Sequence, residues 1–142
     1  MNYKDIVSIP NDILLTEVGG LLAEGREVII PTKGRSMRPF IVGERDSVRL
    51  RKHGSVECGD IVLAKVDGGS FVLHRVRKVD GNVLTLKGDG NLGAVEHCTL
   101  DDVLGTVEEI IRPDSSVAPS KGRFWNFLPR IVRRVILHYE NN

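Results

Sequence analysis

The sequence has few cysteines and no long apolar run. Its 142 residues include only Cys58 and Cys98, which are too few and too far apart for a disulfide framework, so we expect a reducing compartment. No stretch approaches the roughly 20 apolar residues that cross a bilayer, and residues 1–10 lack the charged and apolar segments of a secretory leader. We therefore expect a cytoplasmic protein that is soluble or, at most, peripheral to a membrane.

The chain also lacks a charge excess of either sign. Its 20 Lys/Arg and 19 Asp/Glu give a net charge of +1, so we expect no nucleic-acid partner. The charge is uneven, however, because residues 121–134 carry five Lys/Arg and no acid. A zinc tetrad drawn from the four residues His53, Cys58, His97 and Cys98 has poor spacing, since the last two would diverge on a strand. We expect no metal and no other cofactor.

The apolar pattern predicts a mainly β protein with a helix at each end. Apolar residues spaced by three and four follow Asn11, and Gly25 can end that helix. Six runs typical of strands follow, at residues 27–30, 46–51, 61–66, 70–79, 83–87 and 103–111. These patterns divide the chain into an N-terminal amphipathic helix (residues 1–25), a β domain (26–112), and a linker with a basic amphipathic C-terminal helix (113–142).

A small nucleophile, Ser36, lies between a flexible and a rigid residue. Gly34 permits backbone conformations closed to other residues, and Pro39 restricts the residue before it. Together they can hold the Ser36 hydroxyl on a tight, exposed bend. A serine alone is a weak nucleophile, so the site also needs a base and a group that orients the base.

The candidate base is His74, in the middle of the strand predicted at residues 70–79. A histidine on an apolar face is more often a hydrogen-bonded core residue than a catalytic one. If residues 80–81 form a two-residue hairpin loop, His74 pairs with Lys87, and Asp89 lies on the same face, about 7–8 Å away along the diagonal. Asp89 could then orient His74, although a turn residue is the other interpretation. A slip of one residue would move Asp89 to the opposite face.

Six short motifs, in order over residues 33–107, resemble the S24/S26 serine peptidase superfamily, which contains type I signal peptidases and self-cleaving SOS-type repressors. The motifs are Gly34-Arg35-Ser36-Met37-Arg38-Pro39-Phe40, Gly43-Glu44-Arg45-Asp46-Ser47-Val48, Gly59-Asp60-Ile61-Val62-Leu63, Leu73-His74-Arg75-Val76, Lys87-Gly88-Asp89-Gly90-Asn91 and Leu104-Gly105-Thr106-Val107. The resemblance implies a signal-peptidase-like β-fold.

The resemblance also implies roles for three side chains: Ser36 as nucleophile, His74 as general base and Asp89 as the residue that orients the base. Eubacterial signal peptidases and the repressors have a lysine as base, whereas archaeal and endoplasmic-reticulum type signal peptidases have a histidine, as here. The backbone N–H of Ser36 is the first candidate for an oxyanion donor. Family members often place a serine donor two residues before the nucleophile, where this chain has Gly34.

The expected function is that of a serine endopeptidase that cleaves an extended peptide or a leader-type substrate by acyl transfer. The alternative is a non-catalytic peptide-binding or regulatory module that retains the peptidase fold. The basic C-terminal helix, with Arg130, Arg133 and Arg134 beside apolar residues, also leaves two interpretations open. It can pack on the body of the protein, or it can contact a membrane surface or another protein.

Overall fold

The computed structural model describes residues 11–91 and 93–140; expectations for residues 1–10 lie outside this range. The helices are α2 (Asn11–Ala23), α3 (Arg123–Phe127) and α4 (Arg130–Glu140). The strands are β1 (Val28–Pro31), β2 (Ser47–Arg51), β3 (Ile61–Val66), β4 (Ser70–Asp80), β5 (Val83–Lys87), β6 (Glu96–Thr99), β7 (Val103–Ile111) and β8 (Ser116–Val117), with 3₁₀ turns η1 (Asp67–Gly69) and η2 (Leu100–Asp102). The prediction of a mainly β chain with a helix near each end is confirmed.

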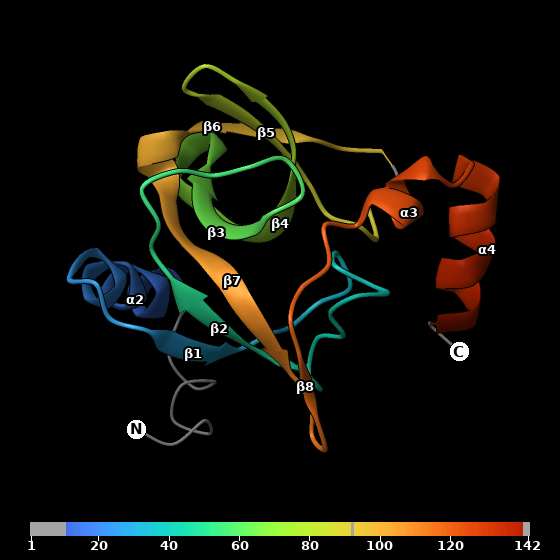
Figure 1. Cartoon of the computed structure of the whole chain (residues 1–142), viewed down its shortest axis with the longest axis horizontal. Helices are drawn as coiled ribbons and strands as arrows, with labels where there is room; N and C mark the ends of the chain where they lie inside the picture. Colours follow the sequence, from blue (N-terminus) through green and yellow to red (C-terminus); the bar gives the residue numbers. More distant parts are fainter. Residues whose placement is uncertain (1–10, 92, 141–142) are drawn as a thin grey trace.

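The strands form one antiparallel sheet that curls on itself. Their order is β1-β2-β7-β3-β4-β5-β6, and β8 pairs with β7. Figure 1 shows β3 to β6 bent into a ring at one end of the sheet, with α2 against the other end. The long strand β4 pairs with β3 from Ser70, but with β5 only from Arg75 onward. The first half of β4 therefore has one edge without a partner strand among the described residues.

Strand β3 is buried on both faces because two apolar cores lie against it. Ile61 and Leu63 point into a core shared with α2, β1, β2 and β7, whereas Val62 and Ala64 point into the core inside the curled strands. An uninterrupted apolar run is the sequence pattern of such a strand, since neither face is left for polar side chains. Both cores converge on β4, which carries the candidate base.

Helix α2 packs on the sheet through one apolar stripe. Val18 and Leu22 are buried in the first core. Gly19 lies so close to β7 that an added Cβ would be 2.9 Å from Leu104 Cδ2. The helix ends where predicted, because Gly25 adopts a positive φ of 86° and its N–H bonds to the Leu22 carbonyl. The helix therefore forms part of the same core as the sheet.

The hairpin between β4 and β5 differs from the prediction by one position. Its loop is formed by residues 81 and 82, so Asp80 pairs with Val83, and a bulge at Arg77 shifts the register again. As a result Lys87 pairs with Arg75 and not, as predicted, with His74. In a strand, a shift of one residue moves a side chain to the opposite face. Because of this shift, Arg75 contacts Asp89, and His74 contacts Glu96 instead.

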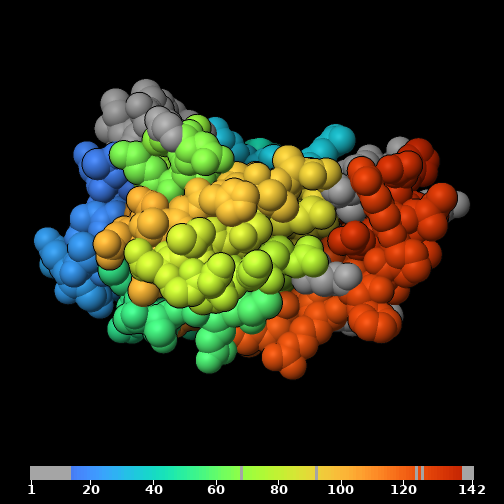
Figure 2. Space-filling model, turned by 90° about the horizontal axis from the view of Figure 1, so that it is seen from above, coloured from blue at the N-terminus to red at the C-terminus, as the bar shows by residue number. Residues whose placement is uncertain are grey.

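The C-terminal segment docks on the sheet and then projects away from it. Trp125 of α3 is buried, with its ring edge-on to Phe40 at 6.2 Å between centroids. Figure 2 shows α3 and α4 as a lobe at one end of the molecule. Within the described residues, no helix is long and apolar enough to cross a membrane.

Candidate functional site

The Ser36 bend forms as the sequence predicts. Gly34 has a positive φ of 82°, and residues 36–40 form consecutive turns in which the Ile41 N–H bonds to the Met37 carbonyl. Met37 and Ile41 point inward into the first core and fix the loop to the body. The Ser36 side chain is left half-buried at the rim of a pocket.

Glycines let neighbouring segments pack directly against this loop. The Gly90 N–H donates to the Ser36 carbonyl at 2.8 Å. A Cβ added to Gly88 would lie 2.3 Å from the same carbonyl oxygen, and one on Gly43 would lie 2.3 Å from the Gly34 carbonyl. These distances leave no room for a side chain, so glycine is needed at both positions to hold the Ser36 loop between two backbone segments.

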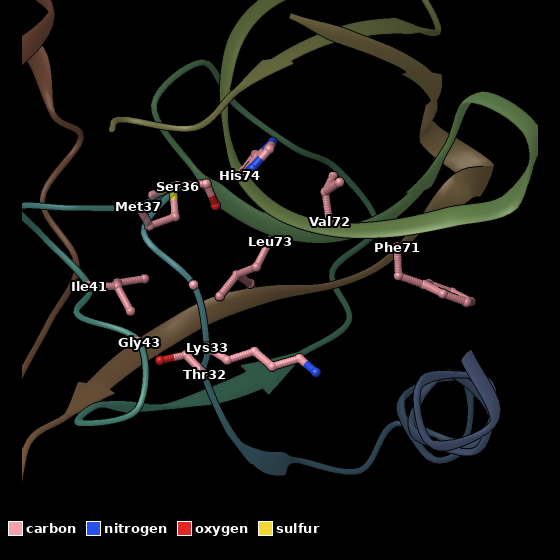
Figure 3. A pocket seen from close by; sticks show the side chains of 11 residues that line it. Thr32, Lys33, Ser36, Met37, Ile41, Gly43, Phe71, Val72, Leu73 and His74 are labelled. Atoms are coloured by element: carbon pink, nitrogen blue, oxygen red, sulfur yellow. The ribbon is translucent and has the colours of Figure 1, made fainter. Parts of the chain in front are cut away.

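His74 faces this loop from β4, just before β4 begins to pair with β5. A Cβ added to Gly88 would be 3.0 Å from Ser36 Cβ and 3.1 Å from His74 Nε2, so both side chains border the same point. Figure 3 shows the Ser36 hydroxyl on the side of its loop that faces the His74 ring. Of the two ring nitrogens of His74, Nε2 is therefore the one that lies on the side of Ser36.

The other His74 nitrogen is bound to a carboxylate. Nδ1 lies 2.5 Å from Glu96 Oε1, and both side chains are largely buried. A carboxylate accepts a hydrogen bond, so Glu96 favours the tautomer with the proton on Nδ1 and the lone pair on Nε2. That tautomer is the one a general base needs in order to take a proton from Ser36.

The prediction that Asp89 orients His74 is wrong, because the Asp89 carboxylate is bonded to Arg75 and not to His74. The carboxylate accepts hydrogen bonds from Arg75, the residue after His74: the single Nε–H is shared between Oδ1 at 2.9 Å and Oδ2 at 3.1 Å, and Nη2 donates to Oδ2 at 2.8 Å. The reason is the register shift, which puts Arg75 on the face where His74 was expected. The turn interpretation is also incomplete, because Asp89 is the buried partner of a buried arginine.

The Arg75–Asp89 pair fixes the C-terminal segment to the loop next to the serine. Arg75 Nη1 donates to the carbonyls of Gly59 and Ser120, and Trp125 Nε1 donates to the Asp89 carbonyl at 2.9 Å. Burial raises the pKa of the Asp89 carboxyl, and the hydrogen bonds and charge of Arg75 oppose that rise. This pair is therefore a structural clamp, placed one residue from the Gly88 contact.

Glu96 was missed because it lies on a strand that the sequence does not reveal. Strand β6 spans only four residues, three of them polar in character, between a glycine-rich loop and a 3₁₀ turn. Its register pairs Glu96 with Leu86, and Leu86 pairs with Val76, two residues after His74. In the sequence, Glu96 is only one of several carboxylates near His74. It can be assigned to His74 only once residues 96–99 are recognised as a strand that pairs with β5.

A groove leads away from Ser36 and His74 between two unpaired strand edges. The pocket at Ser36 has a volume of about 230 Å³, and its apolar walls include Met37, Ile41 and Leu73. It continues into a second cavity of about 440 Å³ that reaches Leu14 of α2. The two cavities share the residues Thr32, Lys33, Phe71, Val72 and Leu73. Among the described strands, β1 has only β2 as a neighbour, so both sides of the groove present free backbone groups.

The wall opposite β4 is held by a buried carboxylate. Asp46 accepts the Val42 N–H at 2.8 Å and the Arg45 Nε at 2.7 Å. The Asp46 carbonyl in turn accepts hydrogen bonds from the backbone and hydroxyl of Thr32, a groove residue. This loop fixes the strand end that leads into the Ser36 bend.

The described part of the chain contains no group of three or more His, Cys, Asp or Glu side chains placed to hold a metal ion. His53 instead lies 2.8 Å from Glu108, on the surface of the sheet.

Comparison with protein families gives one match. The model of the family described as Peptidase S24-like matches residues 3–106, which is most of the chain and includes Ser36, His74 and Glu96. No curated protein matches the chain.

Proposed function

Because the chain belongs to the Peptidase S24-like family, we propose that it is a serine endopeptidase in which Ser36 is the nucleophile, His74 the general base and Glu96 the residue that orients His74. The observation that carries this proposal is the position of the His74 ring, with Nδ1 on Glu96 and Nε2 beside Ser36. Serine acyl transfer requires a nucleophile, a base beside it and a carboxylate that orients the base, and Ser36, His74 and Glu96 lie in that order.

The reaction proceeds by two successive acyl transfers, first from the substrate to Ser36 and then from Ser36 to water. His74 Nε2 takes the Ser36 Oγ proton as Oγ forms a bond to the carbonyl carbon of the substrate, and Glu96 stabilises the resulting imidazolium. The imidazolium then gives its proton to the leaving amine as the peptide bond breaks, which leaves an ester on Ser36. Water, deprotonated by His74, hydrolyses that ester in the same way and restores the free serine.

The oxyanion of each tetrahedral intermediate needs preorganised donors. The Ser36 backbone N–H has no protein acceptor within the described residues, so it is available for this role. An added Cβ on Gly34 would meet nothing within 4 Å. The space beside the nucleophile is thus open to a second donor from water or from the substrate itself.

The groove favours a peptide in extended conformation. A strand laid between β1 and the first half of β4 can bond to the free backbone groups on both sides. The pocket at Ser36 is lined by Met37, Ile41 and Leu73, so it suits an apolar side chain next to the scissile bond. A leader-type segment fits this description, because such segments are extended and apolar before the cleavage point.

Digestion of a mixture of unstructured peptides, with new termini identified by mass spectrometry, tests the proposal. We expect new termini that follow apolar residues with the wild-type protein and none with Ser36→Ala. Identical termini from both proteins would show that the cleavage comes from a contaminant and would contradict the proposal.

A second candidate function is a non-catalytic peptide-binding module. The open space at Gly34, where no side-chain donor supports the oxyanion, favours it. This candidate predicts that wild type and Ser36→Ala bind the same extended peptides equally and that neither protein cleaves them.

A further inference from the structure

The lobe formed by α3 and α4 has an apolar stripe that the described remainder of the protein does not cover. Phe127 at the end of α3 is 89% exposed, and Ile131 and Val135, about one turn apart on α4, are 68 and 51% exposed. Figures 1 and 2 show the lobe projecting from the body of the molecule. Large apolar side chains this exposed and this close together mark a contact surface.

The stripe is separate from the apolar residues that hold the lobe in place. Trp125 and Leu137 are buried, and Trp125 is also hydrogen-bonded to the Asp89 carbonyl. Packing on the body, one of the two interpretations of this helix, thus accounts for these two residues and leaves Phe127, Ile131 and Val135 without a role in the fold.

The lobe carries a net positive charge. Helices α3 and α4 contain four arginines and one acid, Glu140, and the side chains of Arg123, Arg130 and Arg134 are exposed. The positive region extends onto the sheet: burial lowers the pKa of Lys87, and the nearby charges of Arg133, Arg77 and Arg130 lower it further. An occupant of this surface must therefore bring negative charge.

We infer that the α3–α4 lobe docks on an anionic lipid surface, with Phe127, Ile131 and Val135 inserted at the headgroup level and Arg123, Arg130 and Arg134 against the lipid phosphates. A short helix with an apolar stripe flanked by arginines is the pattern of an interfacial helix. A second copy of this chain fits less well, because it would bring the same positive charges to the contact.

The attachment of the lobe gives this docking a consequence for the groove. Trp125 bonds to Asp89, and the adjacent Gly88 packs against Ser36 and His74. A lobe held at a lipid surface is therefore bonded directly to the segment that packs against Ser36 and His74. The docking itself does not require Ser36 to be reactive.

Vesicle co-sedimentation with the full chain tests the inference. We expect binding to vesicles of equal parts phosphatidylcholine and phosphatidylglycerol, and at least tenfold weaker binding to phosphatidylcholine alone. Arg130→Gln combined with Arg134→Gln removes two cations near the surface, so binding to the anionic vesicles should weaken by roughly tenfold or more. Phe127→Gln combined with Ile131→Gln should weaken it by a similar factor, because the inserted apolar area is lost.

Leu21→Gln on α2 and Lys52→Gln are the matched controls, since both residues are exposed and lie outside the lobe. Both should bind like wild type, and so should Ser36→Ala, which separates this test from the test of catalysis. The inference is overturned if neither vesicle is bound, if both are bound equally, or if the controls lose as much binding as the lobe variants. A wild-type dimer that Phe127→Gln converts to monomer, without lipid binding, would overturn it in favour of self-association.

Discussion

Two neighbouring side chains of β4 make contrasting pairs on opposite faces of the strand. Arg75 is fully buried, and its guanidinium bonds to Asp89 and to two backbone carbonyls. His74 is also buried, but among the described residues only its Nδ1 has a hydrogen-bond partner, while Nε2 lies beside Ser36. The arginine has its side-chain bonds within the fold, whereas the histidine has one ring nitrogen on the side of Ser36.

The Arg75–Asp89 pair and His74 should therefore contribute to different properties, the pair to the stability of the fold and the histidine to the reaction. A buried ion pair whose bonds are all satisfied fixes the position of segments but has no free group with which to react. A histidine with one satisfied and one free nitrogen is oriented and still able to act as a base. Changes on the two faces should therefore affect different measurements.

The largest effect is expected from His74→Ala. If His74 is the general base, its loss should lower kcat/KM for peptide cleavage by at least four orders of magnitude, as removal of a triad member does in serine hydrolases. The urea midpoint of unfolding should fall much less than in variants of the Arg75–Asp89 pair. Cleavage retained near the wild-type rate would show that His74 is a core residue only.

Glu96→Gln should lower kcat by up to four orders of magnitude. The amide can donate to Nδ1 and so favour the tautomer with the proton on Nε2, which cannot accept the Ser36 proton. The matched control is His97→Gln, because His97 is the exposed neighbour on the same strand. Equal rates for Glu96→Gln and His97→Gln would remove Glu96 from the mechanism.

Asp89→Asn is expected to act on stability instead. It leaves the Arg75 guanidinium buried without a counter-charge, which costs about 3–5 kcal/mol of unfolding free energy. Chemical denaturation measures this loss. In a double-mutant cycle, Arg75→Met combined with Asp89→Asn should lose less than the sum of the two single variants. Additive losses would show that the two side chains do not act as a pair.

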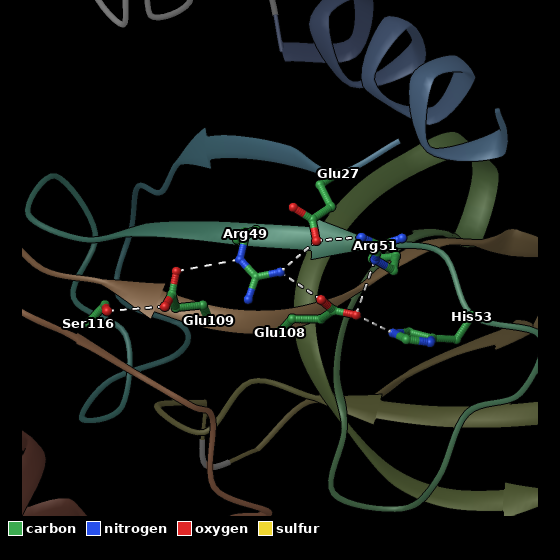
Figure 4. Close-up of polar contacts among 7 residues, drawn as sticks. All are labelled: Glu27, Arg49, Arg51, His53, Glu108, Glu109 and Ser116. Atoms are coloured by element: carbon green, nitrogen blue, oxygen red, sulfur yellow. Dashed lines mark hydrogen bonds and ion pairs between the residues drawn. The ribbon is translucent and has the colours of Figure 1, made fainter. Parts of the chain in front are cut away.

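The smallest effect is expected from the partly exposed charges around Arg49 on β2. Figure 4 shows Arg49 between Glu27 on one segment and two carboxylates of β7 on another, with Nη1 3.0 Å from Glu27 and 2.7 Å from Glu108. Water and salt screen such pairs, so Glu108→Gln should leave the urea midpoint nearly unchanged. A loss as large as that of Asp89→Asn would mean that solvent exposure does not distinguish the two clusters.

The sequence predicted the parts of the fold that local patterns determine. Strands β3, β5 and β7 have the predicted bounds, because apolar runs and turn residues mark both ends of each. The Gly34 bend also formed as expected, since only its local conformation mattered. The resemblance to serine peptidases linked Ser36 with His74, and the structure brings the two side chains to the same point, which spacing alone could not predict.

The parts that depend on register were not predictable in this way. Moving the hairpin loop from residues 80–81 to residues 81–82 reversed the assignment of Asp89, and nothing local distinguishes these two turns. Glu96 was hidden because β6 is short and mostly polar, so its strand identity comes from pairing with β5 and not from its own pattern. Errors of register therefore changed a residue's role without changing the fold.

The rate at which a fluorophosphonate probe modifies Ser36 tests the central claim, that Glu96 and not Asp89 orients His74. The probe reacts with a serine only when a base activates it. At a temperature where every variant is folded, we predict that Asp89→Asn is modified at nearly the wild-type rate and that Glu96→Gln is modified at least a hundredfold more slowly. Slow modification of Asp89→Asn together with a wild-type rate for Glu96→Gln would contradict the account.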